Sequence, residues 1–393
     1  MAKISSSNGL EKRPKLRFPG YDEPYKQCRI GDIYAERSQR GASDMELLSV
    51  TMNNGVMPRS AIEGKDNSSE DKSNYKVVLT GDMVYNSMRM WQGANGISPC
   101  DGIVSPAYTV LMPKIPISNG YFAALFKSPN LINEFRKNSQ GMTSDTWNLK
   151  YPQIETIKVS IPTLSEQERI ADMLGTLEKR IIKQARLVDS LKKYKRGVVS
   201  AILSHRIKFS DTDGKPYPEW ISCTLQDAVD FLDGQRKPLE SADRARRQGT
   251  YPYYGASGII DYIDDYIFDE PLLLLGEDGA NIINRSTPLC FIAMGKYWVN
   301  NHAHVMRPKN GHNIKFLCEL LESLDYTRYN TGTAQPKLNQ EKCRGIELVL
   351  PIYEEQRRIA DFLSALDQKA EQEQSNLACL LQLKKGILQQ LFI

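Results

Sequence analysis

Two stretches of sequence decide the fold, Pro162-Thr-Leu-Ser-Glu-Gln-Glu-Arg-Ile-Ala-Asp-Met-Leu-Gly-Thr-Leu177 and Pro351-Ile-Tyr-Glu-Glu-Gln-Arg-Arg-Ile-Ala-Asp-Phe-Leu-Ser-Ala-Leu366. They align without a gap at an offset of 189 residues, with Pro, Glu, Gln, Arg, Ile, Ala, Asp and the last two Leu identical. The same offset pairs Lys195 with Lys384. A repeat of this length indicates one structural unit that is written twice in the chain.

The segments that precede these stretches match more weakly, at an offset of 195 residues. Cys28 aligns with Cys223, and Val77–Gly81 aligns with Leu272–Gly276. The change of offset implies a six-residue length difference between about residues 121 and 149. We therefore expect each unit to have a variable front portion and a repeated tail.

The two tails read as long helices with a heptad seam. Apolar residues recur at alternating spacings of four and three over more than four heptads, which is typical of a coiled coil. The predicted seam is Ile170, Leu174, Leu177, Ile181, Val188 and Leu191 in the first tail, and Ile359, Leu363, Leu366, Leu377, Leu380 and Ile387 in the second. Lys195 and Lys384 are polar breaks at equivalent places, and Ser165 is a candidate N-cap.

Each helix has about 38 residues and should span about 57 Å. A lone helix with such a seam would expose a long apolar stripe, whereas two helices in one chain can bury each other. We expect an antiparallel pair about a pseudo-twofold axis. The alternative is that each helix packs on its own globular domain or on another subunit.

The front portions read as compact domains of mixed helix and strand, so the fold class is α/β (α+β). Expected strands cover residues 75–79, 83–86, 103–112, 272–275, 289–294 and 303–306, and expected helices cover residues 121–138 and 314–324. The expected domains are residues 1–160, helix 161–205, residues 206–349 and helix 350–393. A polar link over residues 204–218 leads to the second domain, and residues 1–12 are expected to be disordered.

Composition excludes several classes of protein. The chain has 393 residues, is 41% hydrophobic and 25% charged, and has no apolar run long enough to cross a membrane. Its N-terminus has no apolar signal-peptide core, so a cytoplasmic location is expected. Seven scattered cysteines without a CxxC pair argue against disulfides and zinc modules. The net charge of +4 permits a nucleic-acid partner.

Signatures of catalysis are scarce. The sequence contains no Walker GxxxxGK[ST], no GxGxxG after a strand and no Asn-Pro-Pro-aromatic segment. His302 and His304 could face one metal ion from a strand, but structural histidines are the better interpretation because no third ligand is evident. We therefore predict neither catalytic nor metal-binding residues.

Features of nucleic-acid binding are better supported. Arg and Lys read guanine edges, Asn and Gln read adenine edges, and positive side chains anchor phosphates. Segments with these residues beside aromatic ones give the candidate contacts Arg89, Gln92, Asn95, Arg236, Lys237, Tyr254, Lys296, Asn301, Gln335 and Lys337. Trp91 and Trp298 in the same segments are more often core residues.

These features together resemble the specificity subunit of type I restriction-modification enzymes. The order of a variable domain, a helix beginning Pro-x-x-x-Glu-Gln-x-x-Ile-Ala, a second variable domain and a second such helix covers nearly the whole chain. Target-recognition-domain motifs are similar to Tyr85–Gly93, Gly102–Tyr108, Tyr253–Ile259 with Gly276–Gly279, and Trp298–His302.

The resemblance implies two target-recognition domains that each read one half of an asymmetric, bipartite site in double-stranded DNA, with the helices setting the unread spacer. It implies a non-catalytic subunit that binds no cofactor and docks two modification subunits, which hold S-adenosylmethionine. Restriction subunits that use ATP and Mg would then join. The alternatives from the residues alone are a coiled-coil adapter without a DNA role and a lone DNA-modifying enzyme with an unrecognised site.

Overall fold

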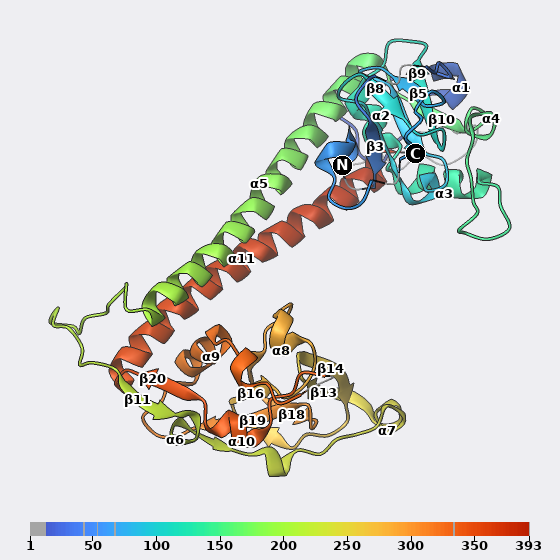
Figure 1. The fold of residues 1–393 in the computed structure, drawn as a ribbon. Coiled ribbons are helices and arrows are strands. Elements are labelled where there is room, and N and C mark those ends of the chain that lie inside the picture. The colour runs from blue at the N-terminus through green and yellow to red at the C-terminus, as the bar shows by residue number, and fades with distance from the viewer. Residues whose placement is uncertain (1–12, 42–43, 53, 67, 333–334, 393) are drawn as a thin grey trace. The chain divides into compact units, whose positions relative to one another are not determined.

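The computed structural model describes residues 13–41, 44–52, 54–66, 68–332 and 335–392 (Figure 1), so the expected disorder of residues 1–12 lies outside the described residues. The chain divides into two compact units. Unit 1 contains the residues up to 185 and those from 375 on, and unit 2 contains residues 186–374. The long helices α5 (Leu164–Leu203) and α11 (Tyr353–Leu391) each contribute one part to each unit.

Unit 1 is built around an antiparallel sheet with the strand order β2-β9-β6-β7. The strands of this sheet are β2 (Tyr34–Glu36), β9 (Tyr108–Pro113), β6 (Met83–Asn86) and β7 (Asn95–Ile97). Three further antiparallel pairs flank it, β1 (Lys26–Arg29) with β10 (Lys158–Ile161), β3 (Leu48–Thr51) with β4 (Gly55–Pro58), and β5 (Lys76–Val78) with β8 (Gly102–Val104). The short helical elements are α1 (Ile30–Ile33), η1 (Arg59–Ala61), η2 (Met90–Gln92), α2 (Asn119–Leu125), α3 (Pro129–Asn138) and α4 (Tyr151–Ile154).

Unit 2 contains two four-stranded sheets. The first is antiparallel, with β12 (Val229–Phe231), β19 (Ala303–Pro308), β16 (Leu272–Gly276) and β17 (Cys290–Ala293) in that order. The second has the order β14 (Gly258–Ile263), β13 (Gln248–Gly255), β18 (Lys296–Val299) and β15 (Phe268–Asp269), and β11 (Ile221–Thr224) pairs separately with β20 (Glu347–Leu350). The short helical elements are α6 (Leu225–Ala228), η3 (Asp233–Gln235), α7 (Ser241–Arg246), α8 (Asn281–Asn284), α9 (Ile314–Ser323), η4 (Thr327–Tyr329) and α10 (Gln340–Arg344).

The repeat in the sequence is a repeat in the structure. The sheet β2-β9-β6-β7 of unit 1 has its counterpart in β12-β19-β16-β17 of unit 2. One alignment was wrong, because the counterpart of β16 is β6 and not the segment Val77–Gly81. Both β6 and β16 lie between two strands of their sheets, whereas β5, which overlaps that segment, pairs with β8 in a separate sheet. Two apolar strands alike in sequence cannot be told apart until their pairing is known.

The repeat extends to individual hydrogen bonds at the start of each long helix. In unit 1 the Gln167 side chain donates to the carbonyl of Pro162 and accepts from the amide of Ser118, at 3.0 and 3.1 Å. In unit 2 Gln356 donates to the carbonyl of Pro351 at 2.8 Å and accepts from the amide of Asn313 at 2.9 Å. The identical Pro and Gln of the two stretches therefore tie each long helix to the helix that Ser118 or Asn313 caps.

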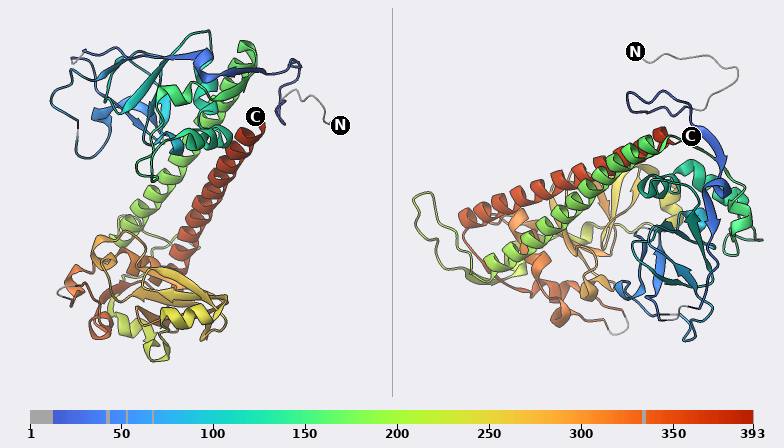
Figure 2. Two further views of the ribbon diagram at one scale, coloured as in Figure 1. Left: turned by 90° about the vertical axis from the view of Figure 1, so that its right-hand side faces the viewer. Right: turned by 90° about the horizontal axis from the view of Figure 1, so that it is seen from above.

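The two long helices run antiparallel in each unit (Figure 2). In unit 1 Ile170 and Leu174 of α5 share a core with Leu391 of α11, and Glu178 forms an ion pair with Lys384. In unit 2 Lys195 forms an ion pair with Asp367 at 2.7 Å, while Val199 and Ile202 pack with Ile359 and Leu363. Residue numbers thus rise along one helix as they fall along the other, which confirms the antiparallel pair.

Every residue of the predicted seam is buried or half-buried. Both interpretations of the seam hold in part, since the ends of the helices also pack on the globular cores. The unit 1 core joins Ile170 to Phe122 and Phe126, and the unit 2 core joins Ile359 to Phe316. Helix pairing and docking on the domains therefore use the same apolar stripe.

Several element boundaries differ from those expected. The expected strand over residues 103–112 is two strands, β8 and β9, and the expected helix over residues 121–138 is two helices, because Ser128 caps α3 and Pro129 begins it. Ser165 is not the cap of α5. The hydroxyl of Thr163 accepts the amide of Glu166 at 3.4 Å, and α5 begins at Leu164.

Candidate nucleic-acid interface

The unit 1 candidates lie around η2 but do not share one environment. Gln92 is exposed and Arg89 is half-buried, and among the described residues the Arg89 guanidinium has no ion-pair partner. Asn95 is fully buried, and its amide donates to the carbonyl of Phe126 at 3.2 Å. The prediction that Asn95 reads a base is therefore corrected, because its amide is used inside the core; Arg89 and Gln92 stay predictions.

An aromatic cluster beside η2 was missed in the sequence. Trp91 packs edge-on against Trp147 with 5.2 Å between ring centroids, and Arg136 lies over the Trp147 ring at 5.6 Å. Both tryptophans are half-exposed, so their rings and Arg136 form part of the surface next to Gln92. Trp147, a large aromatic residue in the largely polar segment 139–148, is the sequence feature that could have indicated this cluster. This surface offers stacking and positive charge, which nucleic acids use.

The unit 2 candidates gather around a buried carboxylate, Asp233. Its oxygens accept the amide of Val305 at 2.8 Å, the side chain of Gln340 at 2.8 Å and Nδ1 of His304 at 2.7 Å. Burial would raise the pKa of Asp233, but the hydrogen bonds from His304 and Val305 outweigh it, so the pKa lies below its ordinary value. The segment that begins at Asp233 is thereby fixed in place, and with it the candidates Arg236 and Lys237.

Arg236 and Lys337 meet at one acidic side chain. Glu277 lies 2.8 Å from the Arg236 guanidinium and 3.3 Å from Nζ of Lys337. Arg236 also donates to the carbonyl of Ala303 at 2.8 Å. Its charge is largely neutralised inside unit 2, so its geometry is that of a group that holds a loop. Asn301 and Gln335 are exposed on loops beside this cluster.

The remaining unit 2 candidates have other contacts. Tyr254 stacks on Phe291 with 5.7 Å between centroids and is half-buried, and Lys296 lies 4.6 Å from the ring of Tyr266. Lys296 is the first residue of strand β18. Lys237 is exposed, and Trp298 is a core residue whose ring nitrogen donates to the carbonyl of Lys237 at 2.6 Å.

A hairpin of unit 2 was also missed as a surface feature. Strands β13 and β14 are joined at Gly255 and Gly258, and Gly258 has a φ of +123° that only glycine adopts without strain. Ile259, Ile260 and Tyr262 are 45%, 54% and 49% exposed along β14. Exposed apolar side chains of this size, close together on one strand, are typical of a contact surface.

The two histidines have structural partners. His304 is fully buried, and its second ring nitrogen lies 2.7 Å from the carbonyl of Leu338, while Nδ1 of His302 lies 2.8 Å from Asp278. No group of three or more His, Cys, Asp or Glu side chains that could hold a metal ion occurs within the described ranges.

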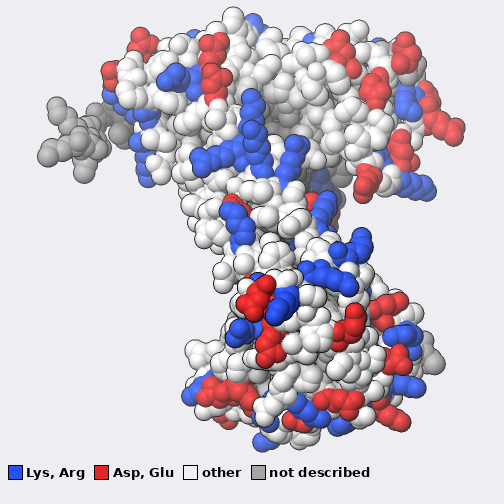
Figure 3. All heavy atoms as spheres, turned by 90° about the vertical axis from the view of Figure 1, so that its left-hand side faces the viewer, with Lys and Arg blue, Asp and Glu red and all other residues white. Residues whose placement is uncertain are grey.

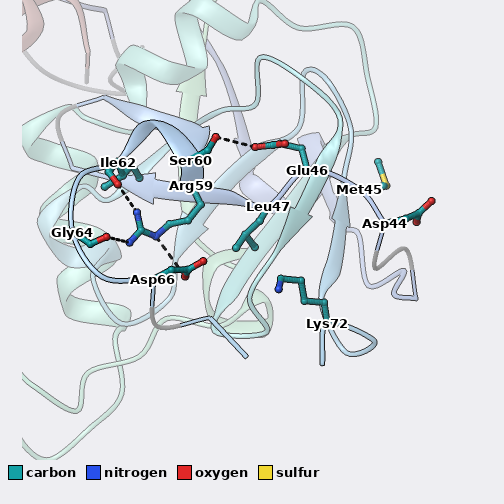
Figure 4. A pocket seen from close by; sticks show the side chains of 10 residues that line it. All are labelled: Asp44, Met45, Glu46, Leu47, Arg59, Ser60, Ile62, Gly64, Asp66 and Lys72. Carbon is teal, nitrogen blue, oxygen red and sulfur yellow. Dashed lines mark hydrogen bonds and ion pairs between the residues drawn. The ribbon is translucent and has the colours of Figure 1, made fainter. Parts of the chain in front are cut away.

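A surface pocket of unit 1, with a volume of about 510 Å³, has the wrong charge for a phosphate (Figure 4). Arg59 points into its wall but donates to the carbonyls of Ile62, Gly64 and Lys65 at 2.7, 3.0 and 2.7 Å. The carboxylates of Asp44, Glu46 and Asp66 line the same pocket. Arg59 therefore shapes the loop, and three carboxylates against the two cations Arg59 and Lys72 leave the lining of this pocket unfavourable for a phosphate.

The comparisons with known proteins identify the class. The sequence profile of the "Type I restriction modification DNA specificity domain" matches residues 23–190 and 218–380. The chain belongs to this family and is a type I restriction-modification specificity subunit. In the described residues no helix is long and apolar enough to cross a membrane.

Individual relatives agree. A Haemophilus influenzae protein named as a type I restriction enzyme specificity subunit is 34% identical over 36% of this chain and 36% of its own length. The EcoprrI specificity subunit of Escherichia coli is 29% identical over 37% of this chain and 35% of its own length. The MjaVIII specificity subunit of Methanocaldococcus jannaschii is 24% identical over 76% of each chain. The matches to the first two relatives thus span about a third of their length.

Solved structures show the same fold. The S subunit of a type I restriction-modification system from M. genitalium superposes with a TM-score of 0.60 at 15% identity, covering 97% of this chain and 99% of that one. The HsdS subunit from Thermoanaerobacter tengcongensis gives a TM-score of 0.51 at 16% identity, covering 98% of this chain and 99% of that one.

Proposed function

We propose that this chain is the cytoplasmic, non-catalytic sequence-reading subunit of a type I restriction-modification complex. Each unit reads one half of an asymmetric, bipartite site in double-stranded DNA, and α5 and α11 set the spacer between the halves. The proposal rests on one observation: the two units share a four-stranded sheet, but the segments inserted between its strands differ. Residues 37–82 of unit 1 carry the hairpin β3–β4, whereas residues 232–271 of unit 2 carry α7 and the hairpin β13–β14.

The position of these segments supports reading by the inserts rather than by the framework. Both segments stand between equivalent framework strands, after β2 and before β6 in unit 1, and after β12 and before β16 in unit 2. Base readout needs side chains that differ between half-sites, while a common scaffold needs side chains that repeat. The hydrogen bonds of Gln167 and Gln356 repeat between the units while the inserted segments differ, which matches that division.

The proposed partners follow from the family. Two modification subunits that hold S-adenosylmethionine dock on the repeated helices, and restriction subunits that use ATP and Mg complete the complex. The chain itself holds no cofactor in this proposal. One solved relative, with a TM-score of 0.59 over 95% of this chain and 98% of that one, comes from work on complex assembly of the type I R-M system.

A segment exchange tests the assignment of half-sites. Residues 20–150, which belong to unit 1 and exclude α5, are replaced by the matching segment of a relative with a known methylated site. Sequencing of methylated DNA should show one half-site changed and the other kept. The reciprocal exchange of residues 219–345 should change only the other half. A change in both halves after either exchange contradicts modular readout.

Two further assays separate the alternatives. Turnover by the purified chain alone, with S-adenosylmethionine or a divalent metal ion, would support a lone enzyme. Absence of salt-dependent binding to duplex DNA, even with modification subunits present, would support an adapter.

A further inference from the structure

Unit 2 has an open groove beside the end of α5, with a volume of about 810 Å³. Its walls are the last turns of α5, the connection from α8 to β17, and the end of α9. All of its lining residues belong to unit 2. Val199 and Leu203 of α5 and Pro288 of the connection supply apolar surface, and hydroxyl groups lie between them.

The repeat shows what covers the equivalent surface in unit 1. The matching elements there are the last turns of α11, the connection from β6 to β7, and α2. Helix α3 lies against them. Its Leu131 shares a core with Met90 of η2 and Leu125 of α2. The Asn130 side chain donates to the carbonyl of Phe392, which follows α11, at 3.5 Å. Unit 1 therefore fills this place with a helix of its own.

Unit 2 has no counterpart of α3 among its described residues. The segment that follows α9 is shorter than the segment that follows α2, and the six-residue length difference between the repeats falls here. Residues 324–332 contain only the short η4. Tyr326 from this segment is buried in the core of unit 2. The surface that α3 covers in unit 1 is therefore left in unit 2 as the groove.

The charges of the lining favour a protein over a nucleic acid. Lys195 pairs with Glu319 at 2.6 Å and Arg285 pairs with Glu322 at 3.0 Å, so these two cations are already neutralised. Arg196 also lines the groove and is exposed, and within the described part of the chain it has no ion-pair partner. Figure 3 shows Lys and Arg interspersed with Asp and Glu over unit 2, the lower part of that view, so the face drawn there is no continuous positive surface for a polyanion.

We infer that the groove of unit 2 binds an amphipathic helix of a partner protein, in the place that α3 takes in unit 1. The inference rests on the proposed function and assigns this helix to one modification subunit, because α5, on which those subunits are proposed to dock, forms one wall. The helix presents apolar side chains at the spacing of Leu131, Ile132 and Phe135 in α3, and a carboxylate to Arg196. Since unit 1 fills its own site, only one of the two modification subunits makes this contact.

The repeat supplies a matched pair of positions for the test. Ser200 lines the groove, its equivalent at the offset of 189 residues is Gln389 in unit 1, and both are exposed. Ser200→Trp fills the groove, and Gln389→Trp is the control. Each full chain is titrated with purified modification subunits, and native mass spectrometry counts the subunits bound. The unaltered chain and the control should bind two, whereas Ser200→Trp should bind one as before and the second about tenfold more weakly.

A photo-crosslinking side chain at the same two positions identifies the occupant. In the assembled complex on duplex DNA, position 200 should crosslink to one helical segment of a modification subunit, and position 389 should not. A crosslink from position 200 to DNA would assign the groove to a phosphate contact and overturn the inference. Equal effects at the two positions, or undiminished binding of two subunits by Ser200→Trp, would overturn it as well. If the unaltered chain binds no modification subunit, the proposed function itself fails, and the inference fails with it.

Discussion

Asp233 illustrates how one residue positions a candidate surface. Its side chain is only 6% exposed, and it joins η3, β19 and the first residue of α10 through Arg236, His304 and Gln340. A buried carboxylate is costly unless it is paired and fully hydrogen-bonded, which this one is. The candidates Arg236 and Lys237 therefore depend on Asp233 for their position.

The variant Asp233→Asn should lose about 3 kcal/mol of stability, because it replaces a buried carboxylate that accepts hydrogen bonds from His304, Val305 and Gln340. Chemical denaturation of the full chain measures the loss. Asp230→Asn is the control, since Asp230 is exposed on the neighbouring strand β12 and should change stability by less than about 0.5 kcal/mol. Equal effects of the two substitutions would contradict a structural role for Asp233.

Two ion pairs that occupy equivalent places in the repeat differ in how deeply their carboxylates are buried. Asp367 accepts from both Lys195 and Lys315 and is 28% exposed, whereas its counterpart Glu178 pairs with Lys384 and is 45% exposed. Burial would raise the pKa of Asp367, but the hydrogen bonds of the two lysines hold it below its ordinary value of 3.8.

We expect Asp367→Asn to cost about 2 kcal/mol and Glu178→Gln at most about 1 kcal/mol. Because the folded pKa of Asp367 is lowered, its contribution is complete above pH 3.8 and is lost as the pH falls through the folded value. Stability curves from pH 7 to pH 2 should therefore converge at the acidic end for Asp367→Asn and the unaltered chain. A constant gap across that range would contradict the pairing.

At the scale of the element, the long helices carry glycines that packing does not require. A Cβ built on Gly197 or Gly386 meets no atom within 4 Å, and both residues lie inside helices. Glycine lowers the stability of a helix interior relative to alanine.

Gly197→Ala and Gly386→Ala should each raise the free energy of unfolding by about 0.5–1 kcal/mol. Thermal or chemical denaturation of the single variants and of the double variant gives the values. Gly120→Ala is the contrasting substitution, because its Cβ would lie 2.9 Å from the Cβ of Ala171, and it should destabilise the protein. Destabilisation by the first two would mean that these glycines are needed for the helix geometry itself.

At the scale of the whole molecule, the chain returns to complete its first unit. The last turn of α11 brings Leu391 and Phe392 into the core that Tyr121 and Phe122 form, and the ring of Phe392 lies 5.4 Å from that of Tyr121. Both residues are at least 98% buried. Unit 1 is therefore assembled from two separate segments of the sequence, the residues up to 185 and those from 375 on.

Leu391→Ala should cost about 3 kcal/mol, and the loss should be confined to unit 1. Amide hydrogen exchange of β9 in unit 1 should accelerate, while that of β19 in unit 2 should not. Leu383→Ala on the same helix, where the side chain is 51% exposed, is the control and should have little effect. Faster exchange in both units would show that they unfold together.

Prediction from the sequence succeeded where residues recur at a regular spacing along the chain. The heptad spacing gave α5 and α11 within a few residues, and the gapless repeat gave the antiparallel pair. It failed where long-range pairing decides, as for the counterpart of β16. It also failed for Asn95, because an amide in a polar segment has the same sequence signature whether it faces solvent or the carbonyl of Phe126.

The sequence by itself determined that one unit occurs twice, that each unit ends in a seam-bearing helix, and that the front portions differ. These features follow from periodicity and repetition, which can be recognised in the sequence itself. Only the tertiary structure decided which strands pair, which candidate side chains stay exposed and which carboxylate neutralises Arg236. Those outcomes depend on contacts between residues that are distant in the sequence. The free energy of such contacts cannot be inferred from a local sequence pattern.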